Sequence, residues 1–269
     1  MGKFLAVTII VIAIASAIPV VMHTWEPPAD ISTHGHLIDS QRDDTMIEAG
    51  VSFLAAQILL AIFIWQFAGS KGGGKRKTFP GGAKGLVGAA LVLVGAEVLA
   101  LGAFGTKAWA TVYFTPPKAD AMPIQVQAGQ FAFYFRYPGP DGKFGATNPE
   151  LEDASAGGEA ALGLDTKDPA SKDDVVTGTM VVPVNREIEV ILRAHDVIHS
   201  LFIPQMRFKQ DAVPGLAIHL HFTAIQTGDY EILCAELCGL GHYKMHGILK
   251  VVSQEEYDKW LAAREAEKQ

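Results

Sequence analysis

Two cysteines near the C-terminus are the residues best suited to metal chemistry. Cys234 and Cys238 are the chain's two cysteines, and His242 and Met245 follow at short spacing. His199 lies upstream in the run Asp-Val-Ile-His-Ser. Two thiolates, two imidazoles and a thioether form a soft donor set, which suits copper cycling between its two oxidation states. The second thiolate indicates two metal ions, because a mononuclear blue-copper site needs one cysteine.

The sequence around these donors predicts a loop. The stretch 234–245 follows a predicted strand and is rich in glycine. A loop lets both sulfurs turn toward a pair of metal ions, while the carbonyl of Glu236, between the cysteines, points at the site. Such a ligand-saturated centre suits electron relay, since it leaves no open position for a substrate.

Two other interpretations stay open from these residues alone. The cysteines, His242 and His246 recur at one interval, which is compatible with a structural zinc site of the Cys₂His₂ type. That site would leave the other two donors without a role. A disulfide between the cysteines is possible in an oxidising compartment but explains neither histidine.

The composition indicates a membrane protein with one extramembrane domain. Of the 269 residues 49% are hydrophobic, and the net charge of −7 disfavours nucleic acid and favours a basic protein partner. Three apolar stretches, at residues 4–22, 46–68 and 86–110, each approach the roughly 20 helical residues that span a bilayer. We therefore expect N-terminal transmembrane helices.

The basic residues predict the orientation of these helices. The densest basic cluster, Lys71 to Lys77 with Lys84, separates the second and third stretches. The positive-inside rule places it in the cytoplasm, so residues 28–115 form a hairpin, the chain after the hairpin lies on the periplasmic side, and the Lys3 end of the first stretch is cytoplasmic if that stretch is a helix. Residues 1–27 are predicted to add another helix. Because Ala15-Ser-Ala17 resembles a processing site, a cleaved signal peptide is the alternative.

Residues 116–252 change to the period of β-strands. Short apolar segments between Gly and Pro turns predict strands at 124–127, 131–136, 179–182, 188–192, 217–222, 230–233 and 247–252. This pattern favours a β-sandwich. Within it, residues 138–178 are predicted to be an acidic surface insertion, which either steers a basic cytochrome or keeps a long loop solvated. Residues 253–269 open with Ser253-Gln-Glu-Glu256, a capping box that predicts a short helix.

The motifs around the metal donors resemble subunit II of haem-copper (cytochrome c) oxidases. The matching segments are 196–200, 209–215, 228–231 and 234–245. The resemblance implies a membrane-anchored all-β protein, in which a cupredoxin-like β-sandwich follows the helix hairpin and its extra helix. It also implies a multi-pass protein of the bacterial cytoplasmic membrane, with the sandwich on the periplasmic side.

The same resemblance implies the function and the partners. A dinuclear CuA centre would accept electrons from cytochrome c or a similar one-electron donor. It would pass them to the haem of subunit I, where O₂ is reduced, within a complex that includes other membrane subunits. The alternatives are a CuA relay subunit of a nitric or nitrous oxide reductase-type complex, and a non-enzymatic, membrane-tethered copper carrier.

The family's site residues transfer to this chain one by one. By resemblance, the copper ligands are His199, Cys234, the backbone carbonyl of Glu236, Cys238, His242 and Met245. The Glu236 carboxylate would bind magnesium at the boundary with subunit I. Where the family usually has Gln-Trp-x-Trp, this chain has Gln130-Phe131-Ala-Phe-Tyr134, so Phe131 and Tyr134 are the candidate residues at which electrons arrive.

Glu97 is an ionisable residue inside the third apolar stretch. A charge is expensive at that depth, which makes such a residue a functional hypothesis by default. Family members have a subunit II carboxylate near a proton-uptake channel. The other interpretation is a hydrogen bond that packs two helices together.

Overall fold

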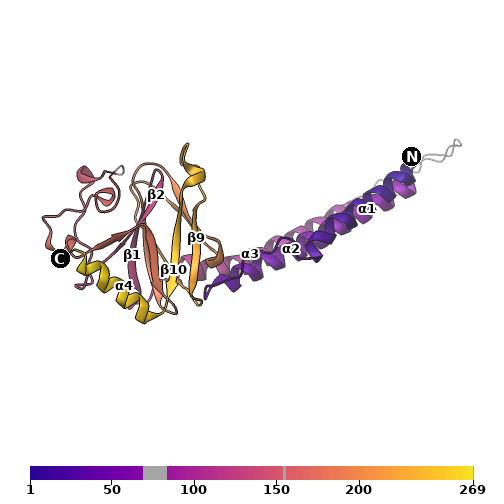
Figure 1. Ribbon diagram of the computed structural model, residues 1–269. Helices are drawn as coiled ribbons and strands as arrows, with labels where there is room; N and C mark the ends of the chain where they lie inside the picture. Colours follow the sequence, from indigo (N-terminus) through magenta and orange to yellow (C-terminus); the bar gives the residue numbers. More distant parts are fainter. Residues whose placement is uncertain (69–83, 154–155, 269) are drawn as a thin grey trace. The chain divides into compact units, whose positions relative to one another are not determined.

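The chain divides into a helical unit and a β-domain. The computed structural model describes residues 1–68, 84–153 and 156–268. One compact unit comprises residues 1–27 and 37–109, and the other comprises 28–36 and 110–269. Three long helices come first along the chain and ten strands follow (Figure 1). This order confirms the predicted fold class.

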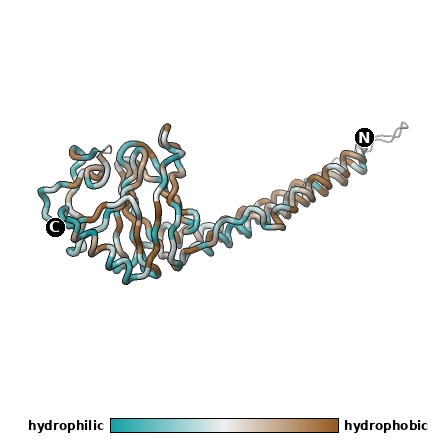
Figure 2. The backbone as a smooth tube through the Cα atoms, in the orientation of Figure 1, coloured by the Kyte–Doolittle hydropathy of each residue, from teal (hydrophilic) through white to brown (hydrophobic). Residues whose placement is uncertain are grey.

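The three helices are long and apolar enough to cross a membrane. They are α1 (Gly2–Val21), α2 (Gly35–Phe67) and α3 (Lys84–Tyr113). In Figure 2 the hydrophobic residues of the helical unit are concentrated toward the end marked N. With 33 residues, α2 is about 50 Å long, more than the roughly 30 Å of a bilayer core. It begins before the predicted apolar stretch because hydropathy detects only the apolar part of a helix. Of the predicted basic cluster, residues 71–77 lie outside the described residues, and Lys84 opens α3.

A hydrogen bond joins two of these helices at Glu97. The Ser52 hydroxyl of α2 donates to Glu97 Oε1 of α3 at 2.5 Å. A bond between two helices gives the carboxylate a partner within an apolar segment, where an unpaired polar group would be costly. The geometry therefore favours the helix-packing interpretation of Glu97.

The β-domain is a sandwich of two five-stranded sheets. The first sheet contains, in spatial order, β3 (Val175–Thr177), β2 (Ala132–Tyr137), β1 (Met122–Gly129), β5 (Glu187–Ala194) and β8 (Ile218–Thr223). The second contains β4 (Thr179–Pro183), β10 (His246–Val252), β9 (Gly228–Cys234), β6 (His199–Ile203) and β7 (Phe208–Ala212). The pairs β1/β5 and β4/β10 are parallel, and the remaining pairs are antiparallel.

Alternating side chains build the core between the sheets. In β5, Ile188, Val190 and Leu192 are fully buried, while the residues between them are partly exposed. This period of two is what made most of the strands predictable. The predicted β-sandwich is confirmed, and its architecture is cupredoxin-like. The prediction missed β3, β6 and β7.

Two segments differ from their predicted roles. Residues 28–36, assigned to the hairpin by sequence, belong to the β-domain, where Ile31 N donates to Gln205 O and Ile225 N donates to Ile31 O. The insertion 138–178, predicted to be a surface loop, has a small core of its own formed by Ala161, Leu162 and Leu164. Apolar residues spaced along a Gly-rich loop carry no period, so the sequence did not reveal this core.

The predicted C-terminal helix is confirmed as α4 (Gln254–Ala266). Its capping box is complete, since the Ser253 hydroxyl accepts from Glu256 N and the Glu256 carboxylate accepts from Ser253 N. Trp260 packs edge-on against Tyr137 of β2, with the ring centroids 5.0 Å apart. The helix therefore packs beside β3 and β4, an edge strand of each sheet.

Candidate metal centre

Neighbouring strands place the first two donors side by side. Strands β6 and β9 pair antiparallel, with Leu201 opposite Cys234. His199 lies two residues before Leu201, so both side chains project from the same face of β6. The register therefore brings His199 next to Cys234 although the two residues are far apart in sequence.

Backbone hydrogen bonds close the loop that carries the remaining donors. Cys234 N donates to Met245 O at 3.2 Å, and Ala235 N donates to Ser200 O at 3.1 Å. The short helix η5 (His242–Lys244) then leads into β10. The loop is thus fixed at both ends to the second sheet, and its donors turn inward.

The two sulfurs and two imidazoles lie within reach of shared metal ions. The Sγ atoms of Cys234 and Cys238 are 3.9 Å apart. His199 Nδ1 lies 4.0 Å from Cys234 Sγ, and His242 Nδ1 lies 3.6 Å from Cys238 Sγ. Each thiol thus has its own imidazole. Within residues 1–68, 84–153 and 156–268, the one group of three compact His, Cys, Asp or Glu donors is His199 with the two cysteines.

Two further donors complete the arrangement. Met245 Sδ lies 3.8 Å from Cys238 Sγ, and the carbonyl oxygen of Glu236 lies 3.3 Å from Cys234 Sγ. The thioether therefore accompanies one thiol and the carbonyl the other. The Glu236 side chain is exposed.

The donor set fits a soft cation. Two thiolates bound to one ion at about 2.3 Å with tetrahedral angles are about 3.8 Å apart, close to the observed 3.9 Å. Burial, together with the neighbouring Cys234, raises the pKa of the Cys238 thiol to about 11. A Cys238 thiolate at neutral pH therefore needs a bound cation to stabilise it. Thiolate, imidazole and thioether together suit copper.

Asp196 orients the His199 ring. Its Oδ1 lies 2.7 Å from His199 Nε2, and its Oδ2 accepts from Gln130 N at 2.8 Å. Burial alone would raise the pKa of Asp196, but hydrogen bonds from His199, Gln130 and Val197 outweigh burial and lower it. An ionised Asp196 favours the ring tautomer with the proton on Nε2, which leaves Nδ1 for a metal. Sequence reasoning missed this role, although the Asp-x-x-His spacing is a usable signal.

The structure separates the two candidate residues for electron arrival. Phe131 lies against the loop of residues 234–245, here called the metal loop, because a Cβ added at Gly241 would meet its ring at 2.5 Å. The adjacent Gln130 side chain donates to Cys238 O at 2.5 Å. Tyr134 packs instead against the insertion's core. Phe131 and Gln130, in the turn between β1 and β2, thus both contact the metal loop.

The geometry disfavours both other interpretations of the cysteines. The Sγ separation of 3.9 Å far exceeds the roughly 2.05 Å of a disulfide, and both cysteines are free. His246, the fourth ligand of the zinc alternative, is exposed on β10, where its Nδ1 lies 2.7 Å from Lys244 O. The zinc alternative therefore lacks its last ligand.

Comparisons with known proteins give the family. The model of the family "Cytochrome C oxidase subunit II, periplasmic domain" matches residues 165–252, which include all the proposed ligands. The chain is 31% identical over 260 residues to the alternative cytochrome c oxidase subunit 2 of Bradyrhizobium diazoefficiens, covering 95% of this chain and 90% of the relative. The chain belongs to the cytochrome c oxidase subunit II family. This confirms the predicted family.

Other subunit II proteins match over shorter stretches. Cytochrome c oxidase subunit 2 of Cereibacter sphaeroides is 32% identical over 172 residues, which cover 61% of this chain and 55% of the relative. The crystal structure of the periplasmic domain of subunit II (CoxB) of Bradyrhizobium japonicum is 30% identical. It covers 58% of this chain and 100% of that chain, with a TM-score of 0.42.

Family membership establishes the general role of the chain. Subunit II is part of an oxidoreductase complex and works with subunit I. The apolar helices indicate a membrane anchor, and the matched domain is a periplasmic one. Membership also favours the oxidase over the reductase-type complex and over the non-enzymatic copper carrier.

Proposed function

We propose that this chain relays electrons from cytochrome c or a similar one-electron donor to the haem of subunit I, using a dinuclear copper (CuA) centre. The ligands would be His199, Cys234, the Glu236 carbonyl, Cys238, His242 and Met245. A bound pair of coppers would supply one-electron chemistry, and the two thiolates, two imidazoles, thioether and carbonyl would hold it with little rearrangement. The observation that carries the proposal is the pair of sulfurs 3.9 Å apart, each beside its own imidazole.

The protein's own groups prepare this site before any metal binds. Asp196 holds the His199 ring, and backbone hydrogen bonds hold the loop that carries the other ligands. Cys238, Met245 and His199 are all buried, which keeps water from the donors. Preorganised, buried donors suit a relay, since few groups must move when the charge changes.

Electrons would arrive on the side of the loop that Phe131 covers. Phe131 is about two-fifths exposed, so its ring contacts both solvent and the glycines of the loop. The side chain of the adjacent Gln130 donates a hydrogen bond to Cys238 O. We expect Phe131→Ala to slow the reduction of the centre by cytochrome c, measured by stopped-flow absorbance, whereas Tyr134→Phe leaves the rate unchanged. Equal rates for the wild type and both variants would remove Phe131 from the route.

The remaining roles concern the membrane and subunit I. We place the protein as a multi-pass subunit, with the loop between α2 and α3 in the cytoplasm and the β-domain in the periplasm. The charge distribution of the sequence supports this orientation. The exposed Glu236 carboxylate is free to help bind magnesium where subunit I supplies further ligands.

Metal analysis and electron paramagnetic resonance of the purified oxidase complex test the proposal. We expect two coppers per chain at this centre and one unpaired electron whose hyperfine structure reports both nuclei. A centre that holds zinc, or a single isolated copper, would overturn it.

A further inference from the structure

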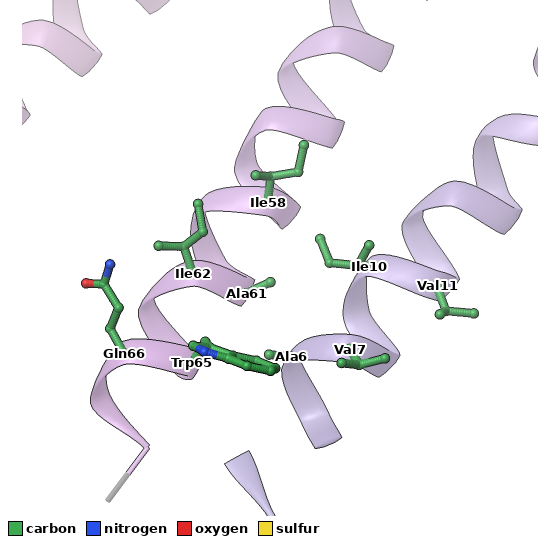
Figure 3. Close-up of a pocket in the computed structure, with 9 residues that line it drawn as sticks. All are labelled: Ala6, Val7, Ile10, Val11, Ile58, Ala61, Ile62, Trp65 and Gln66. Carbon is green, nitrogen blue, oxygen red and sulfur yellow. The ribbon is translucent and has the colours of Figure 1, made fainter. Parts of the chain in front are cut away.

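An apolar groove lies between α1 and α2 at the end of the helical unit near residue 1 (Figure 3). The short side chains of Ala6 and Ala61, both almost fully buried, form its floor. The larger lining residues are Val7, Ile10, Val11, Ile58, Ile62 and Trp65. Small residues let the two helices approach closely, and the flanking branched side chains leave an open channel beside them.

One end of the groove has an amphipathic aromatic and a cation. The Trp65 indole extends from α2 toward α1, next to Ala6 (Figure 3). Lys3 Nζ lies 5.0 Å from the centroid of that ring. Gln66 also lines this end. Tryptophan and lysine together are typical of the level of the lipid headgroups, whereas the rest of the lining belongs to the hydrocarbon core.

We propose that this groove binds one acyl chain of an anionic phospholipid, whose phosphate pairs with Lys3. From Ile58 to Gln66 the groove follows about 12 Å of helix, at 1.5 Å per residue, which matches part of an acyl chain. The cation at its mouth complements a phosphate, whereas a helix of another subunit would fill the apolar part without needing that charge. The inference rests on α1 being retained and on its residue 1 end facing the cytoplasm, and it is independent of the copper ligands.

Native mass spectrometry of the purified full-length chain tests the proposal with two lipids of identical chains, dioleoyl phosphatidylglycerol and dioleoyl phosphatidylcholine. We expect phosphatidylglycerol to bind about fivefold better, because one lysine near the headgroups is worth roughly 1 kcal/mol. Lys3→Gln should abolish this preference, and Lys3→Arg should keep it. Ile62→Trp, which fills the groove, should weaken both lipids, whereas Val92→Trp, on an exposed part of α3, should weaken neither.

Three results would overturn the proposal. The first is an intact mass that lacks α1, and the second is equal retention of both lipids by the wild type. The third is benzoylphenylalanine at position 62 crosslinking to another protein subunit in membranes instead of to lipid. The copper signal of each variant should stay that of the wild type, so a failure here is distinguishable from a failure of the copper proposal.

Discussion

The metal loop and the acidic insertion are both long irregular segments of the β-domain, but different interactions hold them. In the metal loop 234–245, backbone hydrogen bonds hold both ends in place. The two cysteines of the loop are free thiols. In the insertion 138–178, backbone hydrogen bonds such as that from Asn148 N to Gly163 O are joined by side-chain bonds to neighbouring elements. Arg136 of β2 pairs with the fully buried Asp174 and donates to Gly145 O.

The acidic side chains of the insertion also have partners, unlike the free thiols of the metal loop. Asp168 accepts from Ala146 N and Ala170 N, and Glu159 pairs with Lys268 beyond α4. These carboxylates are occupied in shaping the loop, which supports the structural account of its charge over the steering of a cytochrome. The comparison indicates that a segment rich in carboxylates is stably held when they find partners within the protein, here backbone N–H groups and the cations of neighbouring elements. A segment of unpaired donors needs an external cation.

Cys238→Ser should have the largest effect, and it acts on the metal loop alone. Serine cannot bridge soft metal ions, so the copper signal should disappear. Oxygen consumption with cytochrome c should fall by more than about 100-fold, because even changes behind the ligands cost roughly 10- to 100-fold. Leu240→Ala, at a fully exposed position of the same loop, is the matched control and should retain both copper and activity. Respiration that survives Cys238→Ser would refute the proposed bridge.

Arg136→Met should cause the second largest effect, and it acts on the insertion. Burial raises the pKa of Asp174, and Arg136 opposes this shift through its hydrogen bond and charge. Removing one partner of a buried pair costs about 3 kcal/mol or more, which is roughly 6–12 °C in melting temperature. Circular dichroism of the purified full-length chain in detergent measures the loss, and the folded protein should keep its copper signal.

Replacing both partners distinguishes the contribution of the ion pair to stability from the contribution of packing. Arg136→Met combined with Asp174→Leu leaves no uncompensated charge, so its stability should exceed that of Arg136→Met alone. If the double variant is less stable than the single one, the insertion depends on packing more than on charge.

Gly241→Ala should have an intermediate effect on the metal loop. The new Cβ would lie 2.5 Å from the Phe131 ring, so one of them must move, at a cost of about 1–3 kcal/mol. We expect a lower melting temperature and a shifted copper spectrum, both partly restored by adding Phe131→Ala. Gly178→Ala, where a Cβ meets nothing within 4 Å, is the control. An unchanged spectrum would show that Phe131 does not position the loop.

The sequence predicted the metal loop better than the elements that support it. Every proposed ligand except His199 lies in one contiguous motif, so spacing alone was informative. The strand that begins at His199 was missed, because its first two residues are polar yet fully buried. Pattern reasoning expects polar residues outside, so it does not anticipate a buried histidine and serine at the start of a strand.

Contacts between residues far apart in the sequence could not be predicted from it. The bonds from Gln130 to Asp196 and from Arg136 to Asp174 join residues 66 and 38 positions apart, and no local pattern encodes either one. The strand predicted at 131–136 also did not reveal that Phe131 lies in the turn before β2, whereas Phe133 and Phe135 of that strand are buried in the core.

Glu152→Gln should have the smallest effect, and it acts where the two regions meet. Glu152 of the insertion pairs with His195, whose neighbour Asp196 holds the His199 ring. Because both side chains of the pair are partly exposed, its loss should cost only about 0.2–1 kcal/mol. The copper spectrum should not change, because Gln130 N and Val197 N anchor Asp196 independently. A spectrum that does shift would mean that the insertion tunes the metal loop, and the two regions would then have to be treated as one unit.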